Sequence, residues 1–125
     1  MILAAMAALA LQAADPIVGV WRGTSICQVR PSACNDEQAA YHVTRQARGG
    51  GYAFLMNKIV AGAEVTMGVL DTSFVPGTTT LTGFTYDRAH RRGTWTFTPH
   101  GSHMSGRLTD QNGIVIRVIE LDRAP

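Results

Sequence analysis

From residue 17 onward, the chain consists of short segments in which apolar and polar residues alternate, separated by turn-forming residues. Alternation with a period of two is typical of strands whose two faces meet different environments. Turn signals such as Pro76-Gly77 and Asn112-Gly113 separate the segments. The expected strands are residues 17–29, 41–47, 52–60, 65–74, 81–86, 93–99, 103–109 and 114–121. Residues 34–40 are the one candidate for a helical turn, with Asn35 or Asp36 as its cap.

Short connections make neighbouring strands antiparallel, because a parallel pair needs a long crossover. Eight such strands without covering helices would leave two long exposed edges in an open sheet, and closure into a barrel removes both edges. Glycines within strands (Gly68, Gly83 and Gly106) fit the sharp bends of a barrel. We therefore predict an all-β fold, an eight-stranded antiparallel up-and-down β-barrel, with a two-sheet sandwich as the alternative.

The strand at 93–99 separates its two faces, with aromatic residues on one and threonines on the other. The aromatic face is expected to lie inside the barrel. Asp71 alternates with Val69 and is also expected to point inward, where a carboxylate needs a partner such as Arg45 or Arg107. The residues expected to line the interior and contact a ligand are Phe54, Met67, Asp71, Tyr86, Trp95 and Phe97.

Residues 1–14 carry no charged side chain and are too short to span a bilayer. Such a leader is typical of a secretory signal peptide, with residues 15–125 as a single β-barrel domain; an N-terminal helix of the mature fold is the alternative. Cys27 and Cys34 flank a turn-like stretch, and we expect them to form a disulfide in an oxidising compartment. Secretion or a periplasmic location follows from these two expectations.

The charged residues exclude several function classes. The formal net charge is +2 and the basic residues are scattered, whereas a nucleic-acid interface needs a clustered basic face. No nucleophile elbow, zinc-protease helix or phosphate-binding loop is present, so we expect neither an enzyme nor a cofactor or metal. The basic residues at 88–92 form either a solvated hairpin tip or a cationic gate that favours an anionic ligand.

The early Gly19-x-Trp21 motif, the meander of strands and a late arginine together resemble the calycins, the lipocalin, fatty-acid-binding and avidin-type barrels. The resemblance implies that Trp21 closes one barrel end and stacks against Arg117 or Arg123. Small periplasmic inhibitors of secreted metalloproteases are also similar, with one disulfide and an early G-x-W. Their inhibitory N-terminal arm would here precede Ile17 and be very short.

The leading functional hypothesis is non-covalent binding of a small, largely apolar or amphipathic molecule inside the barrel. A protein-interaction or protease-inhibitor module and a packed structural barrel without a ligand are the alternatives. The strand at 52–60 is mixed on both faces and would leave some apolar surface outside the barrel, which is compatible with a homo-oligomer interface or with scattered surface exposure. No apolar stretch after residue 14 is long enough to span a membrane.

Overall fold

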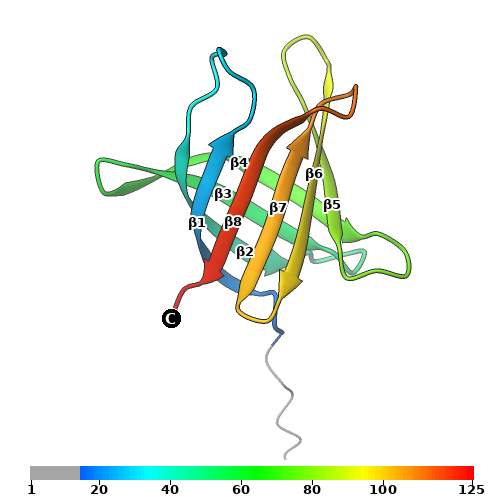
Figure 1. Ribbon diagram of the computed structural model, residues 1–125. Helices are drawn as coiled ribbons and strands as arrows, with labels where there is room; N and C mark the ends of the chain where they lie inside the picture. Colours follow the sequence, from blue (N-terminus) through cyan, green and yellow to red (C-terminus); the bar gives the residue numbers. More distant parts are fainter. Residues whose placement is uncertain (1–14) are drawn as a thin grey trace, which may run out of the picture.

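The computed structural model describes residues 15–125, which form a closed eight-stranded barrel (Figure 1). The strands are β1 (Gly19–Cys27), β2 (Glu37–Arg45), β3 (Tyr52–Val60), β4 (Ala63–Phe74), β5 (Leu81–Tyr86), β6 (Arg92–His100), β7 (His103–Thr109) and β8 (Val115–Arg123). Each strand pairs antiparallel with its neighbours in the sequence, and β1 closes the barrel on β8. The predicted all-β up-and-down barrel is confirmed and is consistent with a calycin-like fold. The predicted signal peptide at 1–14 lies outside the described residues.

The helical turn predicted at 34–40 is wrong, because β2 begins at Glu37 and already pairs with Ser25 of β1 there. The residues expected to cap a helix serve the sheet instead. One carboxylate oxygen of Asp36 accepts the backbone N–H of Cys27 at 2.9 Å. Cys27 and Cys34 form the expected disulfide, which closes the loop between β1 and β2. Tertiary pairing therefore overrides the local helical preference.

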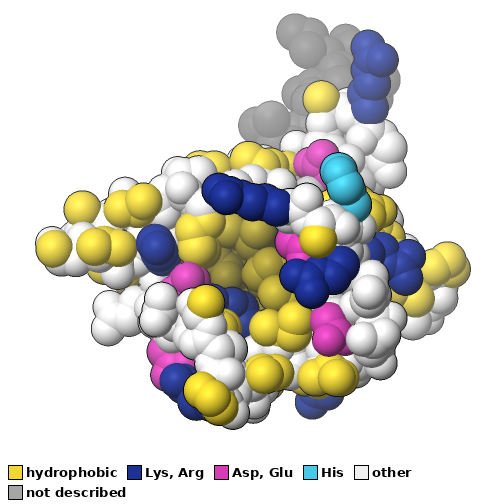
Figure 2. Space-filling model, turned by 90° about the horizontal axis from the view of Figure 1, so that it is seen from above, with side chains coloured by type: hydrophobic (Ala, Val, Ile, Leu, Met, Phe, Trp, Pro, Cys, Tyr) yellow, Lys and Arg dark blue, Asp and Glu magenta, His cyan; other side chains and the backbone are white. Residues whose placement is uncertain are grey.

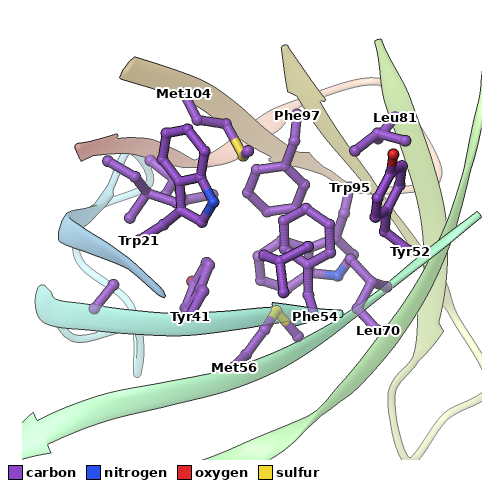
Figure 3. Packing of buried hydrophobic residues seen from close by; sticks show 14 of the residues in the cluster. Trp21, Tyr41, Tyr52, Phe54, Met56, Leu70, Leu81, Trp95, Phe97 and Met104 are labelled. Carbon is purple, nitrogen blue, oxygen red and sulfur yellow. The ribbon is translucent and has the colours of Figure 1, made fainter. Parts of the chain in front are cut away.

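Aromatic side chains fill the central and lower part of the barrel (Figure 3). The rings of Phe54 and Phe97 stack with their centroids 4.6 Å apart, and Tyr41 meets Phe97 edge-on at 6.1 Å. All three side chains are fully buried. Aromatic pairs in these geometries add to the stabilisation that burial alone provides. The interior at this level is a packed core.

Trp21 and Arg123 close the end of the barrel at which β8 ends, which is the lower end in Figure 1. The Arg123 guanidinium lies 4.7 Å from the centre of the Trp21 ring and donates a hydrogen bond to the Val18 carbonyl at 2.7 Å. The Trp21 indole N–H donates to the Ile17 carbonyl at 2.9 Å. A Cβ at Gly19 would lie only 2.7 Å from Arg123 Nη1, so the glycine of the opening motif makes room for this arginine.

Asp15 ties the start of the described chain to the barrel base. Its carboxylate accepts the Ile17 backbone N–H at 2.9 Å, the Arg45 Nε–H at 2.7 Å and the Tyr52 hydroxyl at 2.8 Å. Burial raises the pKa of the Asp15 carboxyl, but these hydrogen bonds together outweigh burial and hold the pKa below its usual value. The ionised form of Asp15 therefore stabilises the folded state.

We expect this contribution to disappear in acid. Because the folded-state pKa of Asp15 is lowered, its contribution is fully present above about pH 4 and declines as pH falls further. Urea unfolding measured between neutral pH and pH 3 should show a smaller acid-induced loss of stability in Asp15→Asn than in the wild type. Parallel profiles for the two proteins would contradict this role of Asp15.

Candidate ligand-binding site

A cavity of about 420 Å³ opens at the end of the barrel opposite Trp21 and Arg123. It lies between the β5–β6 and β7–β8 loops, which stand together at the upper end in Figure 1. Seen from above, this end is hollowed, with hydrophobic side chains inside and charged side chains around the opening (Figure 2). We call this space the cup. Its lining residues are Thr85, Tyr86, Asp87, Arg91, Arg92, Gly93, Leu108, Asp110, Gln111, Asn112 and Ile116.

The wall of the cup comes from inward positions at the upper ends of the strands. Gly93 of β6 contributes no side chain, and a Cβ there would lie 3.0 Å from Leu108 Cδ1 and 3.2 Å from Thr85 Oγ1. Ile116 lies where β8 shifts its register against β7, next to Leu108. The Trp95 indole N–H donates to Thr85 Oγ1 at 2.9 Å. The missing side chain at Gly93 thus lets Leu108 and Thr85 approach β6 closely, and the wall of the cup there is partly apolar.

The carboxylates of the two acidic rim residues, Asp87 and Asp110, accept hydrogen bonds from groups of their own loops. The pKa of Asp87 is lowered, chiefly because its carboxylate accepts the backbone N–H of Arg91, and the same carboxylate pairs with the Arg91 guanidinium at 2.7 Å. Asp110 accepts the backbone N–H groups of Asn112 and Ile114 at 2.9 and 3.0 Å. These contacts shape both loops and use much of the hydrogen-bonding capacity of each carboxylate.

Arg92 differs from Arg91 in its surroundings. Its guanidinium lies 5.1 Å from the centre of the Phe84 ring, a cation–π contact on the outer wall. Within residues 15–125 no carboxylate forms an ion pair with Arg92. Arg92 therefore brings a positive charge to the rim that no protein carboxylate neutralises directly.

A polar cluster lies inside the barrel beneath the disulfide loop, next to the cup wall. Arg117, which follows Ile116, donates through Nη1 to Ser25 Oγ at 3.1 Å and to the Asn35 carbonyl at 3.0 Å. Glu37 approaches the same guanidinium at 3.6 Å. Burial, with a smaller effect from Glu37, raises the pKa of the nearby Tyr41 hydroxyl to about 12, so it stays protonated.

The resemblance left open whether Arg117 or Arg123 stacks against Trp21, and the structure places Arg123 there. Arg117 instead joins the polar cluster at the other end of the barrel. The two arginines are six positions apart on β8, which is long enough to reach from one end of the barrel towards the other. Sequence spacing alone did not distinguish the two roles.

Three of the residues expected to line the interior belong to the packed core. Phe54 and Phe97 have no exposed surface, and Trp95 retains 9%. Trp95 lies parallel to Phe97, with ring centroids 6.3 Å apart, while its indole bonds to Thr85 of the cup wall. Phe54 and Phe97 thus support the core and leave no open space around them. Trp95 connects that core to the cup.

The inward orientation predicted for Asp71 is wrong. The β3–β4 register shifts where Met67 is the extra residue, and this bulge changes which side of the sheet the following residues face. Beyond the bulge Leu70 and Thr72 are buried, so Asp71 between them faces outward and is exposed. Met67 itself is 42% exposed and does not belong to the buried interior. The expected Asp71–Arg45 pair is absent because Arg45 binds Asp15.

Tyr86 lies at the cup, but at its rim and 65% exposed. The residues predicted to contact a ligand did not include Thr85, Leu108 or Ile116, which form much of the wall. Leu108 alternates with Met104 and Gly106 in the sequence, so its inward direction was available as a signal. Ile116 was not predictable in this way, because the register shift in β8 interrupts the alternation.

Comparison with known proteins does not assign this site. No protein-family model matches the chain, and neither the curated proteins nor the solved structures contain a match. Within residues 15–125 the structure has no helix that could span a membrane.

Proposed function

We propose that this protein binds a small molecule with an apolar body, non-covalently and without catalysing its conversion. The observation that carries the proposal is the cup, a cavity of about 420 Å³ bounded by Thr85, Gly93, Leu108 and Ile116. Volumes of roughly 300 to 1,000 Å³ are usual for small-molecule sites in proteins. The proposed ligand occupies the mouth of the barrel and not its centre.

The packing of the barrel supports this placement. The stacked rings of Phe54, Phe97 and Trp95 are buried in the interior below the cup, and a closely packed protein interior leaves no room for a ligand. A ligand in the cup would contact Leu108 and Ile116 without displacing these rings. The proposal therefore combines a packed structural barrel in the lower part with a binding site in the upper part.

The disulfide supports an oxidising, extracytoplasmic location. Bonds such as Cys27–Cys34 persist in secreted and periplasmic proteins and are rare in the cytosol. We propose that the protein acts in such a compartment. A binding protein there meets small molecules from the surroundings of the cell.

A protein-interaction module is the second candidate. The hairpin of β3 and β4 extends beyond the barrel wall (Figure 1), and Val60, Val65 and Met67 on it are exposed. Exposed apolar side chains grouped on one projecting element are typical of contact surfaces. This function would use the hairpin and would not depend on the cup.

The test uses N-phenyl-1-naphthylamine, a neutral probe whose fluorescence rises in an apolar environment. We expect it to bind the wild-type protein and to lose at least about ten-fold in affinity in Ile116→Trp, because the larger side chain fills the cup. The measurement is a fluorescence titration of both proteins, with thermal unfolding to confirm that the variant is folded.

Val60→Trp serves as the matched control, because it adds the same side chain on the exposed hairpin outside the cup. It should leave probe binding unchanged. If the probe does not bind the wild type, or if Ile116→Trp binds it as well as the wild type does, the cup is not the binding site.

A further inference from the structure

The charges at the rim of the cup define what kind of molecule it accepts. Four charged residues line the cup: Asp87, Arg91, Arg92 and Asp110. The two carboxylates accept hydrogen bonds from their own loops, and Asp87 also pairs with Arg91. Neither carboxylate is free to attract a cationic ligand without losing contacts that shape its loop.

Arg92 is the rim charge without a carboxylate partner within residues 15–125. Its guanidinium contacts the face of Phe84 at 5.1 Å, a contact that positions the group while leaving its N–H donors at the ring edge free of a carboxylate. With both carboxylates bound to groups of their own loops, the guanidinium of Arg92 is the rim cation whose N–H donors an anion can use.

The wall and the rim complement each other. Leu108 and Ile116 offer an apolar surface inside the cup, whereas Arg92 offers a cation at its edge. A molecule that satisfies both has a compact apolar body and one anionic group that remains near solvent. The cup volume of about 420 Å³ suits a molecule of one to three fused or linked rings and excludes a long-chain lipid enclosed along its whole length.

We propose that the cup selects small amphipathic anions, such as aromatic carboxylates or sulfonates, and that Arg92 is the residue that determines this charge preference. The inference rests on the proposed function, because it specifies the ligand class of the same cup. Charge-assisted hydrogen bonds from a guanidinium to such an anion are stronger than bonds between neutral groups.

The test compares two probes with the same ring system. The compound 8-anilinonaphthalene-1-sulfonate carries a sulfonate that N-phenyl-1-naphthylamine lacks, and both fluoresce on binding to apolar sites. We expect the wild type to prefer the sulfonate. Arg92→Gln should lower the ratio of the two affinities about five-fold, and Arg92→Lys, which keeps the charge, should retain most of the preference. Added salt should weaken binding of the sulfonate alone.

Arg107→Gln is the matched control, because Arg107 is exposed on β7 and does not line the cup. It should leave both affinities unchanged, and near-UV circular dichroism checks that every variant keeps native packing. Equal wild-type affinities for the two probes, or an unchanged ratio in Arg92→Gln, would overturn the charge preference while leaving the proposed function intact. Failure of the neutral probe to bind would overturn the proposed function itself, and the inference with it.

Discussion

Replacing Trp21 with alanine lowers the free energy of unfolding by about 3 to 5 kcal/mol. The indole is fully buried, donates to the Ile17 carbonyl and lies against the Arg123 guanidinium. Truncation removes a large apolar surface and leaves a cavity at the lower end of the barrel. It also removes the aromatic partner of the partly buried Arg123 guanidinium, which adds to the loss. Urea unfolding at neutral pH measures the change.

Phe84→Ala is the control for Trp21→Ala. Phe84 is also aromatic and lies on a strand, but it is half exposed on the outer wall. We expect its replacement to change stability by no more than about 1 kcal/mol, because surface substitutions have small effects. Similar losses in both variants would show that Trp21 does not close the barrel in the way described.

Gly23→Ala destabilises the barrel by more than about 3 kcal/mol or prevents folding. A Cβ at Gly23 would lie 1.8 Å from the Glu120 carbonyl oxygen, on the strand that closes the barrel against β1. A Cβ is fixed rigidly to the backbone and the atom it would meet is a backbone oxygen, so rotating a side chain cannot relieve the clash. The two strands would have to separate at the seam where the barrel closes. Thermal unfolding, or the yield of soluble protein when unfolding cannot be measured, gives the result.

Gly68→Ala makes the same chemical change where the structure has room. No heavy atom lies within 4 Å of a Cβ built at Gly68, and its backbone is not in the left-handed region. We expect a change within about 1 kcal/mol, of either sign. A wild-type-like Gly23→Ala would contradict the close approach of β1 and β8.

The barrel could be predicted from the sequence because the patterns that indicate it are local and recur in every strand. Alternation, turn residues and the lack of covering helices each favour antiparallel strands that close on themselves. The same reasoning failed at 34–40, where the helix-capping potential of Asn35 and Asp36 is real but weaker than pairing with β1. Local preference predicts an element only when no longer-range contact competes with it.

The candidate site was less predictable, for two physical reasons. Bulges near Met67 and Ile116 change which face the neighbouring side chains occupy, and nothing in the alternation marks them. Aromatic residues such as Phe97 indicate the inside of the barrel but do not indicate whether space remains around them. Gly93 lets Leu108 and Thr85 approach β6 closely in the wall of the cup, and this contact between three strands cannot be read from the sequence.

If the lower barrel is packed, a ligand binds only in the cup. Methyl and aromatic NMR spectra recorded during titration with N-phenyl-1-naphthylamine test it directly. We expect shifts for the methyl groups of Leu108 and Ile116, with those of Met104 and Leu121 in the buried core unmoved. Shifts that spread through the core methyl groups while Leu108 and Ile116 stay unchanged would contradict this expectation and place the ligand inside the barrel.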